Sequence, residues 1–510
     1  MIHQYISNGY HIVLDVNSGC VHVVDETAYR VIPIIEEALA RHVETKEELA
    51  AYAVEKLSAE KNSEVCDVKH QAETEEKTCA QKKHQTEQKE PATTDQGSGG
   101  DRNINLRELE EIIEELLELR EAGMLYTEDV YEKYIDSFHN RETVVKALCL
   151  HIAHDCNLAC RYCFAEEGEY HGRRALMSYE VGRKALDFLV ENSGSRVNLE
   201  VDFFGGEPLM NWQVVKDLVA YGRSLEEPYN KKFRFTLTTN GVLLDDEVLE
   251  FANKEMANIV LSIDGRKEIH DLMRPHRGGQ GSYDEVVPKY KKVAESRNQM
   301  NYYVRGTFTR NNLDFAEDVK HLADEGFEQI SVEPVVAADS EDYALRGEDV
   351  PAILEEYDKL ALEYIRRKKE GKGFNFFHFM IDLEGGPCVA KRLSGCGSGT
   401  EYLAVTPWGD FYPCHQFVGQ EEFLMGNVDE GIVRTDIRDT FKGCNVYAKE
   451  KCKDCFAKFY CSGGCAANAY NFSGSINGTY DLGCELQRKR VECAIMIKAA
   501  LAGEEKERAL

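Results

Sequence analysis

The chain has 510 residues, which predicts about three domains at ~150 residues per domain. Its net charge of −29 argues against electrostatic binding to nucleic acid or to an anionic membrane. No stretch approaches the ~20 apolar residues of a membrane span, and residues Met1–Gly9 carry no secretory signal pattern. We therefore expect a cytoplasmic protein, in which 17 cysteines indicate metal or redox chemistry rather than disulfides.

Residues 1–135 predict a small N-terminal domain. Tyr10–Val16 and Cys20–Asp25 are β-rich runs joined by a turn at residues 17–19, and helical sequence follows from Ala28 to Leu57. A second helix carries one apolar stripe made of Leu106, Leu109, Ile112, Ile113, Leu116 and Leu117. Gly123 ends that helix, and Met124–Tyr126 is expected to be a short extended piece. This outline is winged-helix-like, and its acidic helix favours a peptide ligand over DNA.

Residues 58–105 interrupt this domain with a different composition. The stretch is rich in Glu, Lys, Gln, Thr and Ser and contains no aromatic residue. It cannot bury enough apolar surface to offset the ordering of its backbone, so we expect a disordered insertion. Cys66, His70, Cys79 and His84 leave a zinc site as the less favoured alternative.

Residues 145–385 alternate between strand-like and helix-like runs. Repeated strand–helix units predict a parallel sheet covered by helices, and six units favour a partial barrel over a full one of eight. In such barrels the chemistry lies at the carboxyl ends of the strands. The expected strands are Ala147–Ala153, Val197–Phe204, Phe233–Thr239, Asn258–Ile263, Tyr302–Thr309 and Gln329–Val335.

Three cysteines follow the first of these strands. Cys156, Cys160 and Cys163 form a C-x3-C-x2-C motif, and three thiolates on one loop can each hold one iron of a four-iron cluster. The remaining iron is then open to a small molecule. Zinc is less favoured because a zinc finger needs four ligands and usually has C-x2-C pairs.

The motif Cys156–Cys163, with Tyr162 before its third cysteine, resembles the radical SAM signature. A second element agrees, because Gly205, Gly206, Glu207 and Pro208 follow the next strand. In the superfamily this motif binds the amino group of S-adenosylmethionine (SAM). Two glycines allow a close backbone approach, and Glu207 can accept a hydrogen bond from an ammonium. A plain turn is the alternative interpretation.

Other strand ends carry polar groups as well. The resemblance implies that Ser262 and Arg305 contact the ribose or the carboxylate of SAM. It places Asp264 and Arg274 near the substrate or the adenosine. Each of these residues is equally well explained as a strand-end cap.

The resemblance implies radical chemistry. One electron from a reduced 4Fe-4S cluster cleaves SAM into methionine and a 5′-deoxyadenosyl radical, which abstracts a hydrogen atom from an unactivated carbon. A low-potential electron donor, such as ferredoxin or flavodoxin, and the absence of oxygen are implied. No individual catalytic residue can be named from the sequence.

The region 386–510 is cysteine-rich and resembles a SPASM domain, which carries auxiliary 4Fe-4S clusters. The motif consists of Cys396, Cys414, Cys452, Cys455, Cys461, Cys465 and Cys484. The resemblance implies that the first auxiliary cluster takes Cys396, Cys414 and Cys465, and that the second takes the other four. Cys388 is a candidate fourth ligand of the first cluster, unless that site is open to a substrate thiolate. A zinc ribbon explains only Cys452–Cys465.

Taken together, the sequence resembles the radical SAM/SPASM peptide maturases, most closely those of SCIFF (six-cysteine) peptides. This implies an α/β fold with a partial (β/α)6 barrel, a leader peptide docked near Tyr10–Asp25 and a thioether product in a cysteine-rich precursor. The alternative enzyme is a SPASM oxidase of the sulfatase-maturing type. A third interpretation is a non-catalytic, zinc-loaded regulator.

Overall fold

The structure is a computed structural model that describes residues 1–59, 106–170, 172–383 and 389–509. The predicted insertion at 58–105 therefore lies outside the described residues, except for its first two positions, which end a helix. Cys388 and the cysteines of the insertion lie outside them too. The chain divides into two units, Met1–Asp129 and Val130–Leu510, which are described separately.

In its described residues, the first unit joins a small antiparallel sheet to three helices. Its sheet has the order β1-β2-β3, and a helix at residues 46–59 lies between α1 and α3 in the sequence. The bounds are β1 (Ile2–Ser7), β2 (Tyr10–Asp15), β3 (Val21–Val24), α1 (Glu26–Ala40) and α3 (Leu106–Glu121). The predicted hairpin and the second predicted helix are confirmed, whereas β1 was not foreseen.

The helical sequence expected from Ala28 to Leu57 forms two helices, α1 and the helix at residues 46–59, which are separated at residues 41–45, where His42 has a φ of 63°. One expectation for this unit is wrong. Met124–Tyr126 forms bends rather than an extended piece, because Gly123 and Tyr126 both have positive φ, at 67° and 54°. The sheet has β1 as its third strand, in place of the expected extended piece. The sequence did not predict β1 because its polar and apolar residues alternate only weakly.

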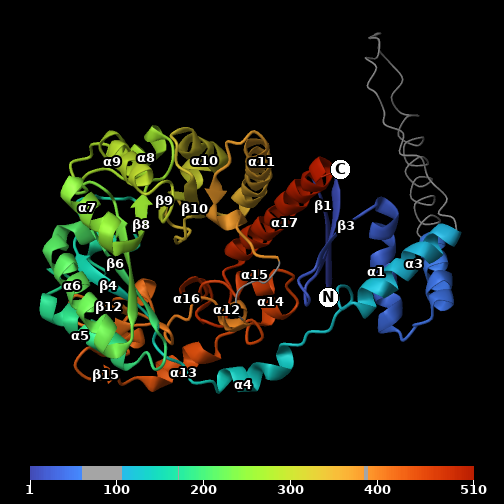
Figure 1. Cartoon of the computed structure of the whole chain (residues 1–510), viewed down its shortest axis with the longest axis horizontal. Coiled ribbons are helices and arrows are strands. Elements are labelled where there is room, and N and C mark those ends of the chain that lie inside the picture. Colours follow the sequence, from blue (N-terminus) through green and yellow to red (C-terminus); the bar gives the residue numbers. More distant parts are fainter. Residues whose placement is uncertain (60–105, 171, 384–388, 510) are drawn as a thin grey trace, which may run out of the picture. The chain divides into compact units, whose positions relative to one another are not determined.

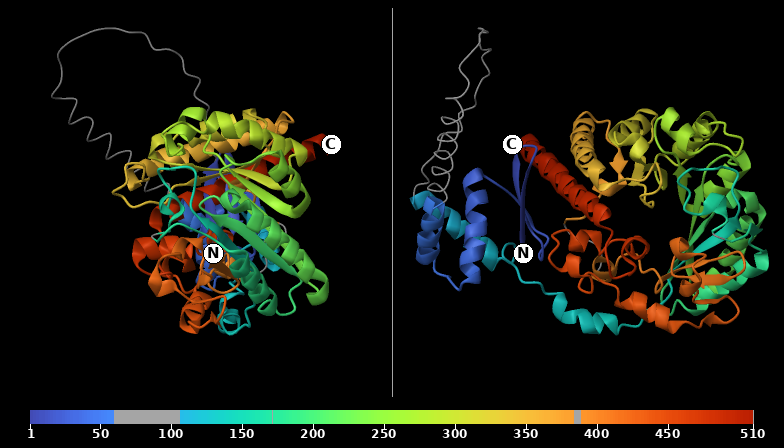
Figure 2. Two further views of the ribbon diagram at one scale, coloured as in Figure 1. Left: turned by 90° about the vertical axis from the view of Figure 1, so that its left-hand side faces the viewer. Right: turned by 180° about the vertical axis from the view of Figure 1, so that it is seen from behind.

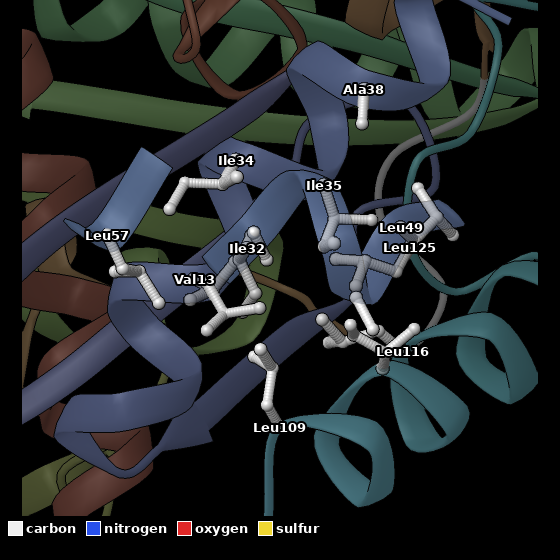
Figure 3. Packing of buried hydrophobic residues seen from close by; sticks show 14 residues of the cluster. Val13, Ile32, Ile34, Ile35, Ala38, Leu49, Leu57, Leu109, Leu116 and Leu125 are labelled. Atoms are coloured by element: carbon white, nitrogen blue, oxygen red, sulfur yellow. The ribbon is translucent and has the colours of Figure 1, made fainter. Parts of the chain in front are cut away.

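The apolar stripe of α3 closes the core of this unit. Leu109, Ile113 and Leu116 are buried and belong to the same cluster as Ile32 and Ile35 of α1 (Figure 3). Each such side chain stabilises the fold by about 1.5–3 kcal/mol when fully buried. Tertiary packing therefore holds a helix whose other face is strongly acidic.

Asp15 ties the hairpin turn to the segment after α3. Its buried carboxylate accepts hydrogen bonds from the backbone N–H groups of Asn17 (3.1 Å), Ser18 (3.0 Å) and Thr127 (2.9 Å). The Asn17 side chain in turn donates to the carbonyl oxygen of Thr127 at 2.7 Å. These bonds connect positions more than one hundred residues apart in the chain.

The second unit is built around one long open sheet. Its strand order is β11-β10-β9-β8-β7-β6-β4-β12-β13-β14-β15, and β4 and β6–β10 are joined in parallel. These six strands confirm the predicted βα units to within about two residues at each end. They are β4 (Ala147–His154), β6 (Asn198–Gly205), β7 (Lys232–Thr239), β8 (Met256–Ser262), β9 (Tyr302–Phe308) and β10 (Gln329–Pro334).

Helices cover the outer side of this sheet, and the strands face the interior of the unit (Figures 1 and 2). The covering helices are α5 (Tyr179–Glu191), α6 (Trp212–Tyr229), α7 (Asp246–Glu255), α8 (Lys267–Met273), α9 (Tyr283–Ser296), α10 (Phe315–Asp324) and α11 (Val350–Lys369). The remaining short elements before residue 400 are α4 (Ile135–His139), β5 (Ala175–Leu176), β11 (Asn375–Phe376) and α12 (Val389–Ser394).

The C-terminal region continues the same sheet. The strand β12 (Tyr402–Val405) pairs in parallel with β4, and β13 (Asp410–Tyr412), β14 (Gly426–Asn427) and β15 (Gly431–Ile432) extend it antiparallel. The sheet is therefore mixed and runs past Gly386, where the βα rhythm of the sequence stops.

Four short helices and one long C-terminal helix follow in the described residues. They are α13 (Thr435–Gly443), α14 (Glu450–Lys453), α15 (Lys458–Cys461), α16 (Ala466–Ser473) and α17 (Asp481–Ala509), which packs along α11. None of the helices in the described residues is both long and apolar enough to pass through a bilayer.

We predict that Asp15→Asn lowers the free energy of unfolding of the first unit by about 2 kcal/mol, because hydrogen bonds to a buried carboxylate are lost. Thermal and urea unfolding measure the change. Asp25→Asn is the matched control: Asp25 caps α1 by accepting from the Ala28 N–H, and asparagine caps a helix equally well. Equal stability of both variants would contradict the role given to Asp15.

Candidate active site

The candidate site lies at one edge of the parallel sheet. The loop of Cys156–Cys163 follows β4, Gly205–Pro208 ends β6, Asn240 follows β7 and Asp264 follows β8. Because the carboxyl ends of parallel strands meet at the same edge, the fold gathers these segments, which are far apart in the sequence.

The cysteine loop brings its three thiols together. The N–H of Cys163 donates to the carbonyl oxygen of Cys160 at 3.1 Å, and Asn240 Nδ2 lies 3.5 Å from the Cys156 sulfur. Burial, with smaller effects of neighbouring charges, raises the pKa of Cys156 to about 11 and that of Cys160 to about 12. These two thiols therefore need a bound cation to be thiolates at neutral pH.

This donor set fits a four-iron cluster. Three clustered thiols supply three iron ligands, and the Arg274 guanidinium, 3.9 Å from the Cys160 sulfur, adds a positive charge beside them. No group of three or more His, Cys, Asp or Glu side chains within the described ranges could hold a single metal ion. In a cubane cluster each thiolate binds a different iron, so its ligands stand further apart than those of one ion.

Asp264 anchors the cysteine loop to the sheet. Its fully buried carboxylate accepts from the Tyr162 hydroxyl at 2.7 and 2.8 Å, from Arg274 Nε at 3.1 Å and from the Thr307 N–H at 3.0 Å. Arg274 also lies 5.4 Å from the centre of the Tyr162 ring. Asp264 therefore positions Tyr162 and Arg274, which we expected only as separate contacts to SAM or substrate.

Glu207 is buried as deeply and joins β6 to β7. Its carboxylate accepts from the Leu209 N–H and the Thr239 hydroxyl, both at 2.9 Å, and from the Asn240 N–H at 2.8 Å. Burial raises the pKa of Glu207 to about 7 against these bonds. Of the roughly four acceptor positions of a carboxylate, three are used within the chain, so one remains on Oε2 for a ligand ammonium.

The two glycines before Glu207 are required by the chain's own backbone. A Cβ on Gly205, where φ is 123°, would lie 2.3 Å from the carbonyl oxygen of Ala153. A Cβ on Gly206 would lie 2.1 Å from that of Asp155. The turn of β6 thus packs directly on the start of the cysteine loop, and Pro208 begins a buried turn after it.

The other two predicted cofactor contacts, Ser262 and Arg305, lie opposite each other on the neighbouring strands β8 and β9. Ser262 ends β8, and its carbonyl oxygen accepts from the Tyr290 hydroxyl at 3.1 Å. Arg305 on β9 is 57% exposed, and its Nη2 lies 3.6 Å from Glu333 Oε1 on β10. His378 Nε2 is 3.2 Å from the same oxygen. Glu333 and His378 were not foreseen, because nothing in their sequence surroundings marks them.

A group of buried histidines beside the loop was also missed. His151 Nδ1 and His154 Nε2 are 2.9 Å apart, because a register shift between β4 and β6 brings both rings together. The Tyr170 ring packs against both, and its hydroxyl donates to the Gly205 carbonyl oxygen at 3.2 Å. Burial lowers the pKa of His154, and likewise that of His415, to about 4, so these rings are neutral at pH 7.

The structure brings the C-terminal cysteines close enough to act on one another's pKa, and the assignment of two cluster sites stays a prediction. Burial raises the pKa of the Cys414 thiol, and charge on Cys465 and Cys396 raises it further. Burial, together with charge on Cys484, Cys452 and Cys455, raises the pKa of the Cys461 thiol to about 12. The second group lines a cavity of about 590 Å³ that also reaches Glu333 and Cys465. Cys388 lies outside the described residues, so the fourth ligand of the first group stays a prediction.

The fold and the gathered cysteines define a class of enzyme. Residues 150–333 match the model of the Radical SAM superfamily, so this part of the chain is a radical SAM domain.

The chain is similar to a sulfatase-maturating enzyme, to a bacteriocin biosynthesis protein and to a solved structure with bound AdoMet. The cysteine-type anaerobic sulfatase-maturating enzyme of Clostridium perfringens (strain 13 / Type A) is 24% identical over 335 residues, which cover 61% of this chain and 85% of the relative. The antilisterial bacteriocin subtilosin biosynthesis protein AlbA of Bacillus subtilis (strain 168) is 26% identical over 288 residues, 54% of this chain and 56% of the relative. A solved structure of native anSMEcpe with bound AdoMet superposes with a TM-score of 0.59 at 20% identity, covering 70% of this chain and 99% of that one.

We predict that Asp264→Asn weakens retention of the SAM-site iron roughly tenfold, because a hydrogen bond to a charged group is worth about 1.5–3 kcal/mol. Iron analysis after anaerobic gel filtration measures this loss. The control is Asp314→Asn, which removes an exposed carboxylate at the start of α10 that pairs with Arg266 at the start of α8. Iron loss from both variants, or from neither, would contradict the anchoring role.

Proposed function

We propose that this radical SAM enzyme forms thioether crosslinks, from a cysteine sulfur to a carbon, in a cysteine-rich ribosomal precursor peptide of the SCIFF type. The observation that carries the proposal is the gathering of seven C-terminal cysteines into two groups beside a radical SAM sheet. Two auxiliary clusters next to the substrate suit a reaction that must bind a thiol and remove an electron.

Three 4Fe-4S clusters and SAM are the proposed cofactors. Cys156, Cys160 and Cys163 hold the cluster that binds SAM, and the two C-terminal groups hold the auxiliary clusters. Bound together, reduced cluster and SAM supply a radical able to abstract a hydrogen atom from carbon. Asp264 and Glu207 fix the loops that surround this site, and the buried rings of His151, His154 and Tyr170 exclude water beside it.

The reaction balances with one SAM per crosslink. The acceptor carbon loses a hydrogen atom to the deoxyadenosyl group, and the substrate thiol loses its proton. One electron leaves as the carbon–sulfur bond forms, which replaces the electron spent in cleaving SAM. Cys396, Cys414 and Cys465 would hold the first auxiliary cluster, which would supply positive charge that favours the thiolate form of a substrate cysteine.

The first unit, a winged-helix-like peptide-recognition domain in this proposal, binds the leader of the precursor. The strands β1 and β3 both form edges of its sheet, and an extended peptide can add a strand to such an edge. Ile6 on β1 is 60% exposed and Val23 on β3 is 51% exposed, which leaves apolar side chains free beside these edges. The position of β3 matches the expected docking region near Tyr10–Asp25.

A second candidate is oxidation of a Ser or Cys side chain to an aldehyde. It is favoured by the relative from Clostridium perfringens, a sulfatase-maturating enzyme matched over 85% of its length. This activity needs no leader peptide, so the two proposals differ in what they require of the substrate.

We expect the full-length, anaerobically reconstituted enzyme with SAM and a reductant to convert a cysteine-rich precursor to a product lighter by two hydrogens per crosslink. Mass spectrometry measures this change. The crosslinked cysteine should resist alkylation after full thiol reduction, which distinguishes a thioether from a disulfide.

The same reaction on the core peptide without its leader should be much slower, and excess free leader should inhibit the full precursor. Conversion of leaderless peptides to a carbonyl product would favour the aldehyde-forming alternative. SAM cleavage with an unchanged peptide would refute the substrate class but not the radical chemistry.

A further inference from the structure

Lys449 is a buried lysine among the C-terminal cysteines. It lies directly before α14 and is only 2% exposed. Its Nζ donates to the carbonyl oxygens of Ile476 at 2.7 Å and of Gly478 at 3.0 Å. The described part of the chain contains no carboxylate in an ion pair with it. A buried ammonium that meets only two carbonyl dipoles is costly unless negative charge lies nearby.

The position of this ammonium is fixed beside a cysteine. The carbonyl oxygen of Ile476 accepts from Lys449 Nζ and also from the Cys444 sulfur, at 2.7 and 3.3 Å. Lys449 and Cys444 line one small cavity together with Cys396 of the first auxiliary group. A Cβ on Gly463 would lie 3.4 Å from the lysine stem, so the segment between Cys461 and Cys465 packs closely on it.

Lys449 also contacts the second auxiliary group through its backbone. Its carbonyl oxygen accepts from the N–H of Cys452 at 2.9 Å, which fixes the start of the helix that carries this cysteine. Burial raises the pKa of the Cys444, Cys452 and Cys465 thiols, and the Lys449 ammonium acts against that rise at each of them. The same positive charge therefore acts on cysteines of both groups.

We propose that Lys449 is the shared positive counter-charge of the two auxiliary clusters and that it holds the reduction potential of both at a higher value. The inference rests on the proposed function, because it requires both groups to hold clusters. Reduction adds negative charge to a cluster, and a buried ammonium nearby favours the reduced state because the low dielectric of the interior screens it little. Lys449 thereby makes each auxiliary cluster a better electron acceptor.

The test is a potentiometric titration of the full-length, reconstituted enzyme followed by electron paramagnetic resonance. Signals that do not change when SAM is added belong to the auxiliary clusters. Lys449→Met removes both charge and hydrogen bonds, Lys449→Gln removes the charge but keeps a donor, and Lys449→Arg keeps the charge. Lys453→Met is the matched control, because Lys453 also lies on α14, is 46% exposed and pairs with Glu450 at 3.1 Å.

We expect Lys449→Gln and Lys449→Met to shift both auxiliary midpoint potentials to more negative values, and Lys449→Arg and Lys453→Met to leave them near the wild-type values. Wild-type potentials in Lys449→Gln would overturn the inference while the proposed clusters stand. If Lys449→Met fails to fold, Lys449→Gln and Lys449→Arg still decide. A wild-type enzyme without auxiliary signals, or with iron for one cluster only, would overturn both this inference and the proposed cluster sites.

Discussion

The carboxylate of Asp264 is the interaction on which the candidate site depends most. It lies buried at the end of β8 and bonds to Tyr162 of the cysteine loop, to Arg274 and to the backbone of β9. A buried carboxylate that lost these donors would pay its full desolvation cost, so the arrangement is strongly favoured as a whole. The loop between Cys156 and Cys163 is thereby set against the sheet edge before any cofactor is bound.

A second buried carboxylate, that of Glu207, connects strand ends in the same way. Glu207 bonds to Thr239 and Asn240, and Asn240 reaches the sulfur of Cys156. Each carboxylate thus links the ends of neighbouring strands, and each leads in one further contact to a cysteine of the loop. In the C-terminal region the buried charge is positive instead, and Lys449 takes a comparable position between two groups of thiols.

The regular parts of the fold could be predicted because their patterns are local. The six strands β4 and β6–β10 and the helix Leu106–Glu121 follow from periodicity, and the cysteine motifs are visible in the sequence from their spacing. Contacts set by the tertiary fold could not be predicted. The pairing of β12 with β4, the register shift that joins His151 to His154 and the pairing of Arg305 with Glu333 depend on which segments the fold brings together. For the same reason, the sequence did not predict that Glu207 and Asp264 hold neighbouring loops in place. The groups that donate hydrogen bonds to their carboxylates come from other parts of the chain.

We propose that three separate cysteine groups each hold a four-iron cluster. Three such clusters contain about 12 irons per chain. The most direct measurement is the iron and sulfide content of the reconstituted full-length protein and of the variant in which Cys156, Cys160 and Cys163 are replaced by alanine. The account predicts that this variant loses about one third of the iron, the share of one cluster in three. Cys20→Ala, which alters a cysteine outside all three groups, should lose none. A wild-type protein with iron for one cluster, or a triple variant that keeps all of its iron, would contradict the account.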